Sequence, residues 1–311
     1  MKLSRQQLAA AKTRGSALMM VFWLMAILTL FLFTSIQLVS SDVALVISQK
    51  HDFRAEQLCE MGIAIAANRE IQRYDPLLQR FDPVAQEGYS VRIRGEGGKL
   101  NINVLLQQQD TEFIDRIFTF WGMELVEAQE LRDALLDWVD PDDETKLNGA
   151  ENEYYSELGF FTYPFNRPFY DIEEMSLVKG IDSLNFVKPG WRSFFTLFSG
   201  GKLDLVEADM ESIMMVAEVS NVAAEDFVVQ RAGADGIEGT EDDTPFASLQ
   251  EALSELGISA EDPQANRLTV NDQTVRIEST GTVGDYRKQI VLVLRNRESN
   301  PVILNREEIF Q

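Results

Sequence analysis

The sequence has very few of the residues from which enzymes and disulfide-stabilised proteins build their sites. Among 311 residues there is one cysteine, Cys59, and one histidine, His51. A single cysteine excludes a disulfide within the chain, and neither residue has a partner of its own kind to complete a metal or nucleophile site. No glycine-rich phosphate loop and no HExxH pattern is present. We therefore expect a protein that is not an enzyme and that uses no organic cofactor.

Basic residues are also scarce, and this bears on the partners. The chain has 28 Lys and Arg against 50 Asp and Glu, and its formal charge is −22. Because nucleic-acid binders neutralise phosphates with Lys and Arg, the charge indicates no nucleic-acid partner. The segment Leu177–Ile181 (LVKGI) is similar to half of a helix-hairpin-helix DNA-binding element, but its second glycine is missing and Asp182 follows. We interpret it as a packing turn.

Charge is absent altogether from Ser16 to Ser41, a run of 26 residues. As a helix this run would be about 39 Å long, more than the roughly 30 Å of bilayer hydrocarbon, so it predicts one membrane-spanning helix. Residues 1–15 carry Lys2, Arg5, Lys12 and Arg14 and no acid. The positive-inside tendency then predicts that this end stays in the cytoplasm and that the rest of the chain is exported.

A secretory signal peptide is the competing interpretation of the N-terminal segment. Its apolar region would span only about 7 to 15 residues and end at a small-x-small cleavage site, so the run is too long. A third interpretation rests on Arg14-Gly15, which resembles the site where prepilin peptidases cut after a glycine and leave the apolar helix attached. That resemblance implies a mature chain that begins at an N-methylated Ser16. Without the four leader cations its formal charge would be −26.

Beyond the membrane run the helix is expected to continue. Asp42 to Tyr74 contains no proline and one glycine, Gly62, and Asp75-Pro76 is a plausible stop because proline pushes the residue before it out of the helical region. Apolar residues at spacings of three and four predict a stripe that docks on a sheet: Ala55, Leu58, Met61 and Ile65.

The remaining chain alternates between strand and helix patterns. Tyr89–Arg94 predicts a strand with Val91 and Ile93 facing inward, and further strands are expected at Phe227–Gln230, Thr274–Ser279 and Gln289–Arg295. Between the first strand and residue 221 the pattern is helical, with two apolar stripes: Ile114, Ile117, Phe118 and Trp121, then Leu131, Leu135 and Trp138. The order of helix, strand, helical block and strands predicts an α+β fold in which a helical domain is inserted into a sheet domain.

The helical block carries short motifs that occur in one order. They are Leu100-Asn101-Ile102-Asn103, Leu135–Glu144 (LLDWVDPDDE), Asn148–Glu151 with Tyr154-Tyr155, Asn166-Arg167-Pro168-Phe169 and Leu177–Gly180. Together they resemble the type II secretion (general secretory pathway) protein K family, the large minor pseudopilins. The resemblance implies a pilin-like fold with a long N-terminal helix packed on an antiparallel sheet and a large inserted α-helical domain.

On this basis we divide the chain into five parts: a prepilin leader (1–15), a transmembrane helix (16–41), the outer spine helix and first pilin strand (42–98), the inserted helical domain (99–221) and the remaining sheet domain with an acidic loop (222–311). The resemblance places the chain in the bacterial inner membrane with a periplasmic body. It implies prepilin peptidase, membrane lipid, the pseudopilus and the other minor pseudopilins as partners.

Met20 stands at the fifth position of the expected mature chain, where most pilin-like proteins carry a glutamate. In the protein K family that glutamate is absent. A carboxylate at membrane depth costs about 2.5 to 3.5 kcal/mol and needs a partner. In a pilin filament, the resemblance implies that this partner is the terminal amine of the neighbouring subunit ahead. A subunit at the front of a filament has none ahead, so methionine fits a tip subunit that initiates or caps assembly. The alternatives are a minor pilin of a type IV pilus or a membrane-anchored periplasmic interaction domain.

The resemblance also implies bound calcium, for which two acidic clusters are candidates. Calcium takes six to eight oxygen ligands from carboxylates, carbonyls and water. The first candidate is the glycine-bent loop 233–245; it is not an EF-hand, because Ile237 and Gly239 occupy ligand positions of that pattern. Its candidate ligands are Asp235, Glu238, Asp242 and Asp243. The second, weaker candidate follows the expected helix end at Pro141 and comprises Asp137, Asp140, Asp142, Asp143 and Glu151.

Overall fold

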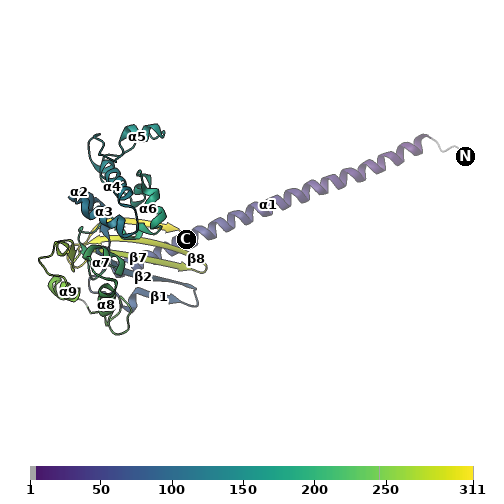
Figure 1. Cartoon of the computed structure of the whole chain (residues 1–311). Helices are drawn as coiled ribbons and strands as arrows, with labels where there is room; N and C mark the ends of the chain where they lie inside the picture. The colour runs from purple at the N-terminus through teal and green to yellow at the C-terminus, as the bar shows by residue number, and fades with distance from the viewer. Residues whose placement is uncertain (1–4, 245, 311) are drawn as a thin grey trace.

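The computed structural model describes residues 5–244 and 246–310. One very long helix, α1 (Arg5–Ala66), projects from a compact body at its C-terminal end (Figure 1). Within α1, residues from Ala17 onward include a stretch that is long and apolar enough to cross a membrane, and it is not buried against the body. One N-terminal apolar helix fits a single-pass anchor, as the sequence predicts.

The helix α1 ends at Ala66, earlier than the expected stop at Asp75-Pro76. Arg297, far along the chain, donates from Nε to the carbonyl oxygen of Ala66 (2.7 Å) and from Nη2 to those of Asn68 (2.7 Å) and Ile71 (2.6 Å). These carbonyl groups are satisfied by a guanidinium group in place of further helical amides. The expected stop at Asp75-Pro76 was therefore wrong, because a tertiary contact ends the helix.

A five-stranded antiparallel sheet lies against the C-terminal part of α1. Its order is β1-β2-β7-β8-β9, with β1 (Gln79–Asp82), β2 (Glu87–Gly95), β7 (Thr274–Val283), β8 (Tyr286–Arg295) and β9 (Val302–Phe310). Three of the four predicted strands lie in β2, β7 and β8, and Val91 and Ile93 are buried as expected. β2 pairs with β7, with Val91 opposite Ser279, although residues 96–273 lie between the two strands in the sequence.

The spine and the sheet share one hydrophobic core, to which α1 contributes Leu58, Cys59, Ile63 and Ala66. The expected stripe was partly wrong, since Met61 is 40% exposed while Cys59 and Ile63 are buried. Close approach explains Gly281 in β7, where an added Cβ would overlap the carbonyl oxygen of Ala55. The thiol of Cys59 accepts from the Gly281 amide (3.0 Å) and donates to a β8 carbonyl (3.2 Å), so Cys59 is a packed core residue.

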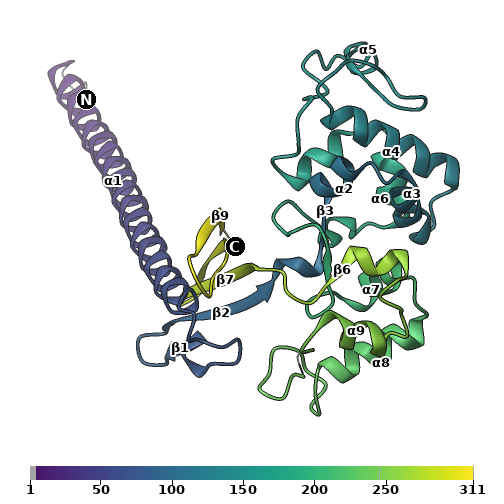
Figure 2. The same cartoon turned by 90° about the vertical axis from the view of Figure 1, so that its left-hand side faces the viewer.

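The long excursion between β2 and β7 forms a separate body beside the sheet (Figure 2). Its helices are α2 (Ile102–Gln108), α3 (Thr111–Phe120), α4 (Leu125–Val139), α5 (Asn152–Glu157), α6 (Ile181–Val187), α7 (Met210–Ala217), α8 (Asn221–Arg231) and α9 (Leu249–Glu255). Two short parallel pairs tie it together: β3 (Leu100–Asn101) with β4 (Phe195–Thr196), and β5 (Leu203–Asp204) with β6 (Leu268–Thr269). We call this body the insert.

The insert has one continuous core, running from Leu100 to Leu268. Both predicted helical stripes are buried in it, in α3 with the following turn and in α4. Phe227–Gln230, predicted as a strand, instead lies in α8, because Ala224, Phe227 and Arg231 form one buried helical face. The helical body consequently runs to β6, well past the expected boundary at residue 221.

Candidate functional site

The acidic loop 233–244 is folded around its own carboxylates. Asp242 accepts hydrogen bonds through Oδ2 from the amides of Ala234 (2.7 Å) and Asp235 (3.0 Å), and through Oδ1 from the Thr240 hydroxyl (2.7 Å). These bonds, the hydroxyl bond foremost, lower the pKa of Asp242. Asp235 accepts from the Ile237 amide (2.7 Å). Two of the four predicted ligands therefore already stabilise turns of the loop.

The other two predicted ligands in this loop differ from each other. Glu238 forms an ion pair with Arg231, a buried residue that also donates to the carbonyl oxygens of Leu205 (2.6 Å) and Ala208 (2.8 Å). Asp243 accepts through Oδ2 from the Gly239 amide (2.7 Å), but its buried Oδ1 has no hydrogen-bond partner within the described residues. Asp243 is thus the carboxylate of this loop with an unused buried oxygen.

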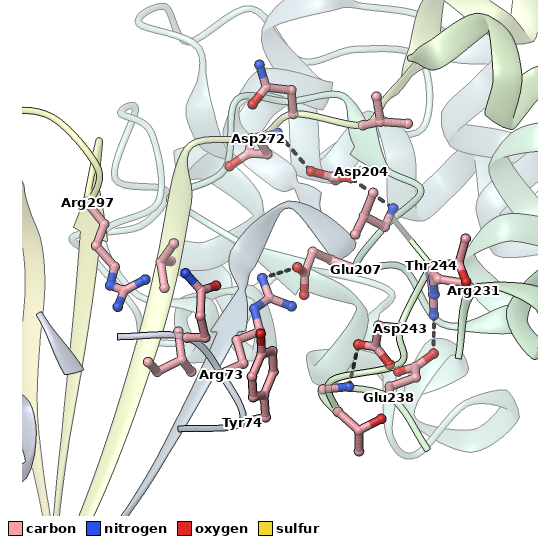
Figure 3. Close-up of a pocket in the computed structure, with 18 of the residues that line it drawn as sticks. Arg73, Tyr74, Asp204, Glu207, Arg231, Glu238, Asp243, Thr244, Asp272 and Arg297 are labelled. Carbon is pink, nitrogen blue, oxygen red and sulfur yellow. Dashed lines mark hydrogen bonds and ion pairs between the residues drawn. The ribbon is translucent and has the colours of Figure 1, made fainter. Parts of the chain in front are cut away.

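This loop forms one wall of a cavity of about 530 Å³ between the insert and the sheet domain. Figure 3 shows Arg73, Tyr74 and Arg297 on the sheet side and Glu238 and Asp243 on the loop side. Two further acids line it: Glu207, which pairs with Arg73, and the buried Asp204, which accepts from the amides of Val206 (2.9 Å) and Asp272 (2.8 Å). Burial raises the pKa of Asp204 to about 6.

The second predicted cluster lies at the C-terminal end of α4. Asp137, fully buried, accepts from the Ala150 amide (2.9 Å) and from the Lys146 ammonium (3.0 Å), which also pairs with Asp140. Gly149 is required here, because an added Cβ would overlap an oxygen of Asp137. Asp142 and Asp143 are exposed: Asp142 accepts from the Glu144 amide (2.9 Å) and Asp143 from the Asn166 side chain (3.2 Å). A lysine thus already supplies a positive charge between the first two carboxylates.

Glu151 is the unusual member of this cluster. It is 3% exposed, and neither carboxylate oxygen has a hydrogen-bond partner among the described residues. Burial, with the nearby charges of Asp137, Asp140 and Asp143, raises its pKa to about 7. Burial also raises the pKa of Asp140, whose Oδ1 is a further buried oxygen without a partner in the described part of the chain.

Neither cluster is a preformed metal centre. Across the described residues, no three His, Cys, Asp or Glu side chains are arranged so that they could hold one ion. The donors are oxygen atoms, as calcium prefers, and unused buried oxygens occur in both places, on Asp243 and on Asp140 and Glu151. The ligand type of both clusters therefore suits calcium. In the part of the chain that the structure describes, the first cluster has no lysine among its carboxylates, whereas Lys146 partly neutralises the second.

The predicted residues of the N-terminal segment lie far from both clusters. Met20 is 72% exposed on the apolar part of α1. Gly15 and Ser16 lie where the helix backbone is described but the side chains are not. The structure therefore shows one continuous helix through the expected cleavage point, and the cleavage remains a prediction.

Comparison with known proteins bears on the insert. Residues 98–187 match the sequence profile of type II secretion system protein K. This segment is a type II secretion system protein K domain. The resemblance inferred from the motifs is confirmed.

Two curated relatives carry the same description, type II secretion system protein K. The chain is 35% identical to the one from Klebsiella pneumoniae over 94 residues, which is 27% of this chain and 28% of that protein. It is 36% identical to the one from Dickeya chrysanthemi over 62 residues, 20% of this chain and 16% of that protein. The matched segment thus spans about a quarter or less of each relative.

The protein K likeness extends to the fold. The structure aligns with a chain of the GspK-GspI-GspJ complex from the type II secretion system of enterotoxigenic Escherichia coli, with a TM-score of 0.63 and 14% sequence identity. The alignment covers 87% of this chain and 99% of that one. The α+β fold with a long N-terminal helix, an antiparallel sheet and a helical insert is therefore confirmed.

A cluster of charged side chains fixes the spine helix to its sheet, and the sequence pattern did not predict it. Lys288 in β8 is 2% exposed at its side chain, and its Nζ lies 2.8 Å from Glu56, 3.3 Å from Asp52 and 3.3 Å from Glu308. Burial opposes its charge, but bonds to these carboxylates outweigh burial and raise the pKa of Lys288. The position of Lys288 at the start of an apolar strand pattern could have predicted this cluster, because a buried lysine needs carboxylate partners.

Proposed function

We propose that the chain is a minor pseudopilin at the tip of the type II secretion pseudopilus, which acts in protein export across the outer membrane by initiating or capping pseudopilus assembly. The observation that supports this most is the protein K domain set between two neighbouring strands of a pilin-like sheet. A membrane anchor with an unrelated purpose would have no need of that combination.

The spine supports assembly through helix contacts. Between the expected membrane run and the sheet, α1 exposes large apolar side chains that are 48% to 62% accessible: Val43, Leu45, Val46, Ile47 and Phe53. Outside lipid such a surface is unfavourable unless other helices cover it. We expect the spine helices of other minor pseudopilins there, of the kind named with GspK in the solved complex.

The insert supports a position at the filament end. It lies to one side of the sheet, away from the axis of α1 (Figures 1 and 2). If every subunit of a packed helical filament carried the insert, the filament would need space for it at every subunit position. Together with Met20, which requires no charged partner from a subunit ahead, this favours one or very few copies at the tip.

The position can be tested by immunogold labelling of pseudopili with an antibody against the insert. We expect gold at one end of each filament. Regular labelling along the shaft would contradict a tip position. A type IV minor pilin, the second interpretation, would instead co-purify with pilus subunits and not with other type II pseudopilins.

The proposal includes the location and the processing of the chain. The body would lie in the periplasm, the N-terminus in the cytoplasm and the apolar part of α1 in inner-membrane lipid. Prepilin peptidase would remove residues 1–15, and Ser16 would be methylated. The resemblance and the cationic, acid-free leader support this part of the proposal.

Calcium is part of the same proposal. In the acidic loop, Asp235, Asp242 and Asp243 would hold it, while Glu238 is engaged by Arg231. In the second cluster Asp140 and Glu151 offer unused oxygens, and Lys146 competes with the ion. When bound, calcium would supply positive charge to clustered carboxylates and so stabilise the folded body.

The calcium test is thermal unfolding of the full chain in mild detergent, with calcium and with chelator. At ambient calcium about a hundredfold above the dissociation constant, binding adds about 2.7 kcal/mol to the free energy of unfolding. We expect Asp242→Ala and Asp243→Ala to abolish the shift. A shift that survives both substitutions places the ion at the Glu151 cluster, and superimposable melts of the unmodified chain would remove calcium from the proposal.

A further inference from the structure

The outer end of the insert carries a group of exposed apolar side chains on α5 and the turn that follows it. Tyr154 is 36% exposed, Leu158 58%, Phe160 51% and Phe161 76%. In both views α5 is the part of the insert that lies furthest from the sheet (Figures 1 and 2). We call these four residues the aromatic tip.

Phe160 of the aromatic tip packs on the aromatic core beneath it. Phe160 stacks on Tyr163, with ring centroids 5.3 Å apart, and Tyr163 lies 5.2 Å from the fully buried Trp138. The Phe160 amide donates to the Tyr155 carbonyl oxygen (2.9 Å), and the Asn152 side chain donates to that of Tyr163 (3.1 Å). Exposed aromatic side chains that are already ordered lose little entropy on binding and commonly anchor protein interfaces.

The net charge around the aromatic tip is negative. Glu153 and Glu157 are exposed on α5 one helical turn apart, and neither forms an ion pair within the described part of the chain. Of the nearest lysines, Lys146 pairs with Asp137 and Asp140. Lys179 donates to the carbonyl oxygens of Asn148 (3.1 Å) and Gly149 (3.0 Å), and its Nζ lies over the Tyr154 ring, 5.1 Å from the centroid. Glu153 and Glu157 together outweigh the single charge of Lys179, so the net charge beside the apolar surface is negative.

We propose that the aromatic tip with Glu153 and Glu157 is a docking surface for a protein segment that combines apolar residues with lysine or arginine. Apolar contact supplies the affinity, and the glutamates select a basic segment over an acidic one. This inference stands on the geometry of the insert and does not depend on the tip position in a filament.

The test measures binding of three fluorescent peptides to the full chain in mild detergent. The peptides share the same leucines and phenylalanines and carry lysine, serine or glutamate at all other positions. We expect the lysine peptide to bind at least tenfold more tightly than the serine peptide, and the glutamate peptide not to bind. Phe161→Ala should weaken the lysine peptide at least tenfold; its ring contributes no aromatic contact to the described core, so the fold should be kept.

Matched controls separate this surface from the general acidity of the chain. Phe186→Ala removes another phenylalanine of the insert, 88% exposed on α6, and should leave binding unchanged. Glu157→Lys should weaken the lysine peptide, whereas Glu255→Lys, on α9 at the opposite end of the insert, should have little effect. Equal binding of the lysine peptide to the unmodified chain and Phe161→Ala, or equal effects of the two lysine substitutions, would mean attraction to net charge alone and would overturn the proposal. Equal binding of all three peptides, or of none, would also overturn it.

Discussion

Replacing Glu151 by glutamine removes a carboxylate that is buried without a hydrogen-bond partner among the described residues. The pKa of Glu151 is raised from 4.5 to about 7 in the folded protein, chiefly by burial. Between pH 4.5 and about pH 7, Glu151 has lost its carboxyl proton in the unfolded chain but retains it in the folded chain. The free energy of unfolding therefore falls as pH rises through this window, and it levels off above about pH 7.

The size of the effect follows from the shift. One pKa unit corresponds to 1.36 kcal/mol. A pKa raised from 4.5 to about 7 therefore means that the charged form of Glu151 lowers the free energy of unfolding at pH 8 by about 3 kcal/mol relative to the protonated form. Glutamine has nearly the same shape and no charge. In the absence of calcium, Glu151→Gln should raise the free energy of unfolding at pH 8 by a similar amount and leave it nearly unchanged at about pH 5.

The assay is urea unfolding of the full chain in mild detergent with chelator, followed by tryptophan fluorescence from about pH 5 to about pH 8. Three of the four tryptophans, Trp121, Trp138 and Trp191, are buried in the insert, and the fourth, Trp23, lies on the apolar part of α1. The change in emission on unfolding therefore reports mainly on the body that contains Glu151. Glu153→Gln, which changes an exposed glutamate in α5, two residues after Glu151, is the control and should follow the unmodified protein. Parallel stability curves for the unmodified chain and Glu151→Gln would refute the reasoning.

The remaining predictions concern the spine. Gly281→Ala should destabilise the packing of α1 on β7 by about 1 to 3 kcal/mol, because the new Cβ overlaps the Ala55 carbonyl oxygen. The control is Gly190→Ala, where nothing lies within 4 Å of the new Cβ. Equal melting temperatures of the two variants would contradict this prediction. Membrane-extracted protein should begin at Ser16 by intact mass, whereas a terminus near Ser41 would indicate an ordinary signal peptide and remove the pilin interpretation.

The sequence by itself determined the elements whose pattern depends only on near neighbours. The uncharged run Ser16–Ser41 requires a membrane or a covering, whatever the rest of the chain does. The stripes of α3 and α4 have helical periodicity, and β2, β7 and β8 alternate or are continuously apolar, so local pattern and burial agree. The motifs that identified the protein K domain are also local, since each lies within a few consecutive residues.

Tertiary structure decided the features that depend on distant residues. The spine ends at Ala66 because Arg297, more than two hundred residues away, binds its terminal carbonyl groups. Phe227–Gln230 reads as a strand by composition, yet it is helical because its face packs into the insert core. Among many acids, only the fold could show that Asp142 faces outward while Glu151 is buried without a partner in the described chain. The energy of a carboxylate is set by its solvation and its neighbours, and neither is encoded at a fixed spacing along the chain.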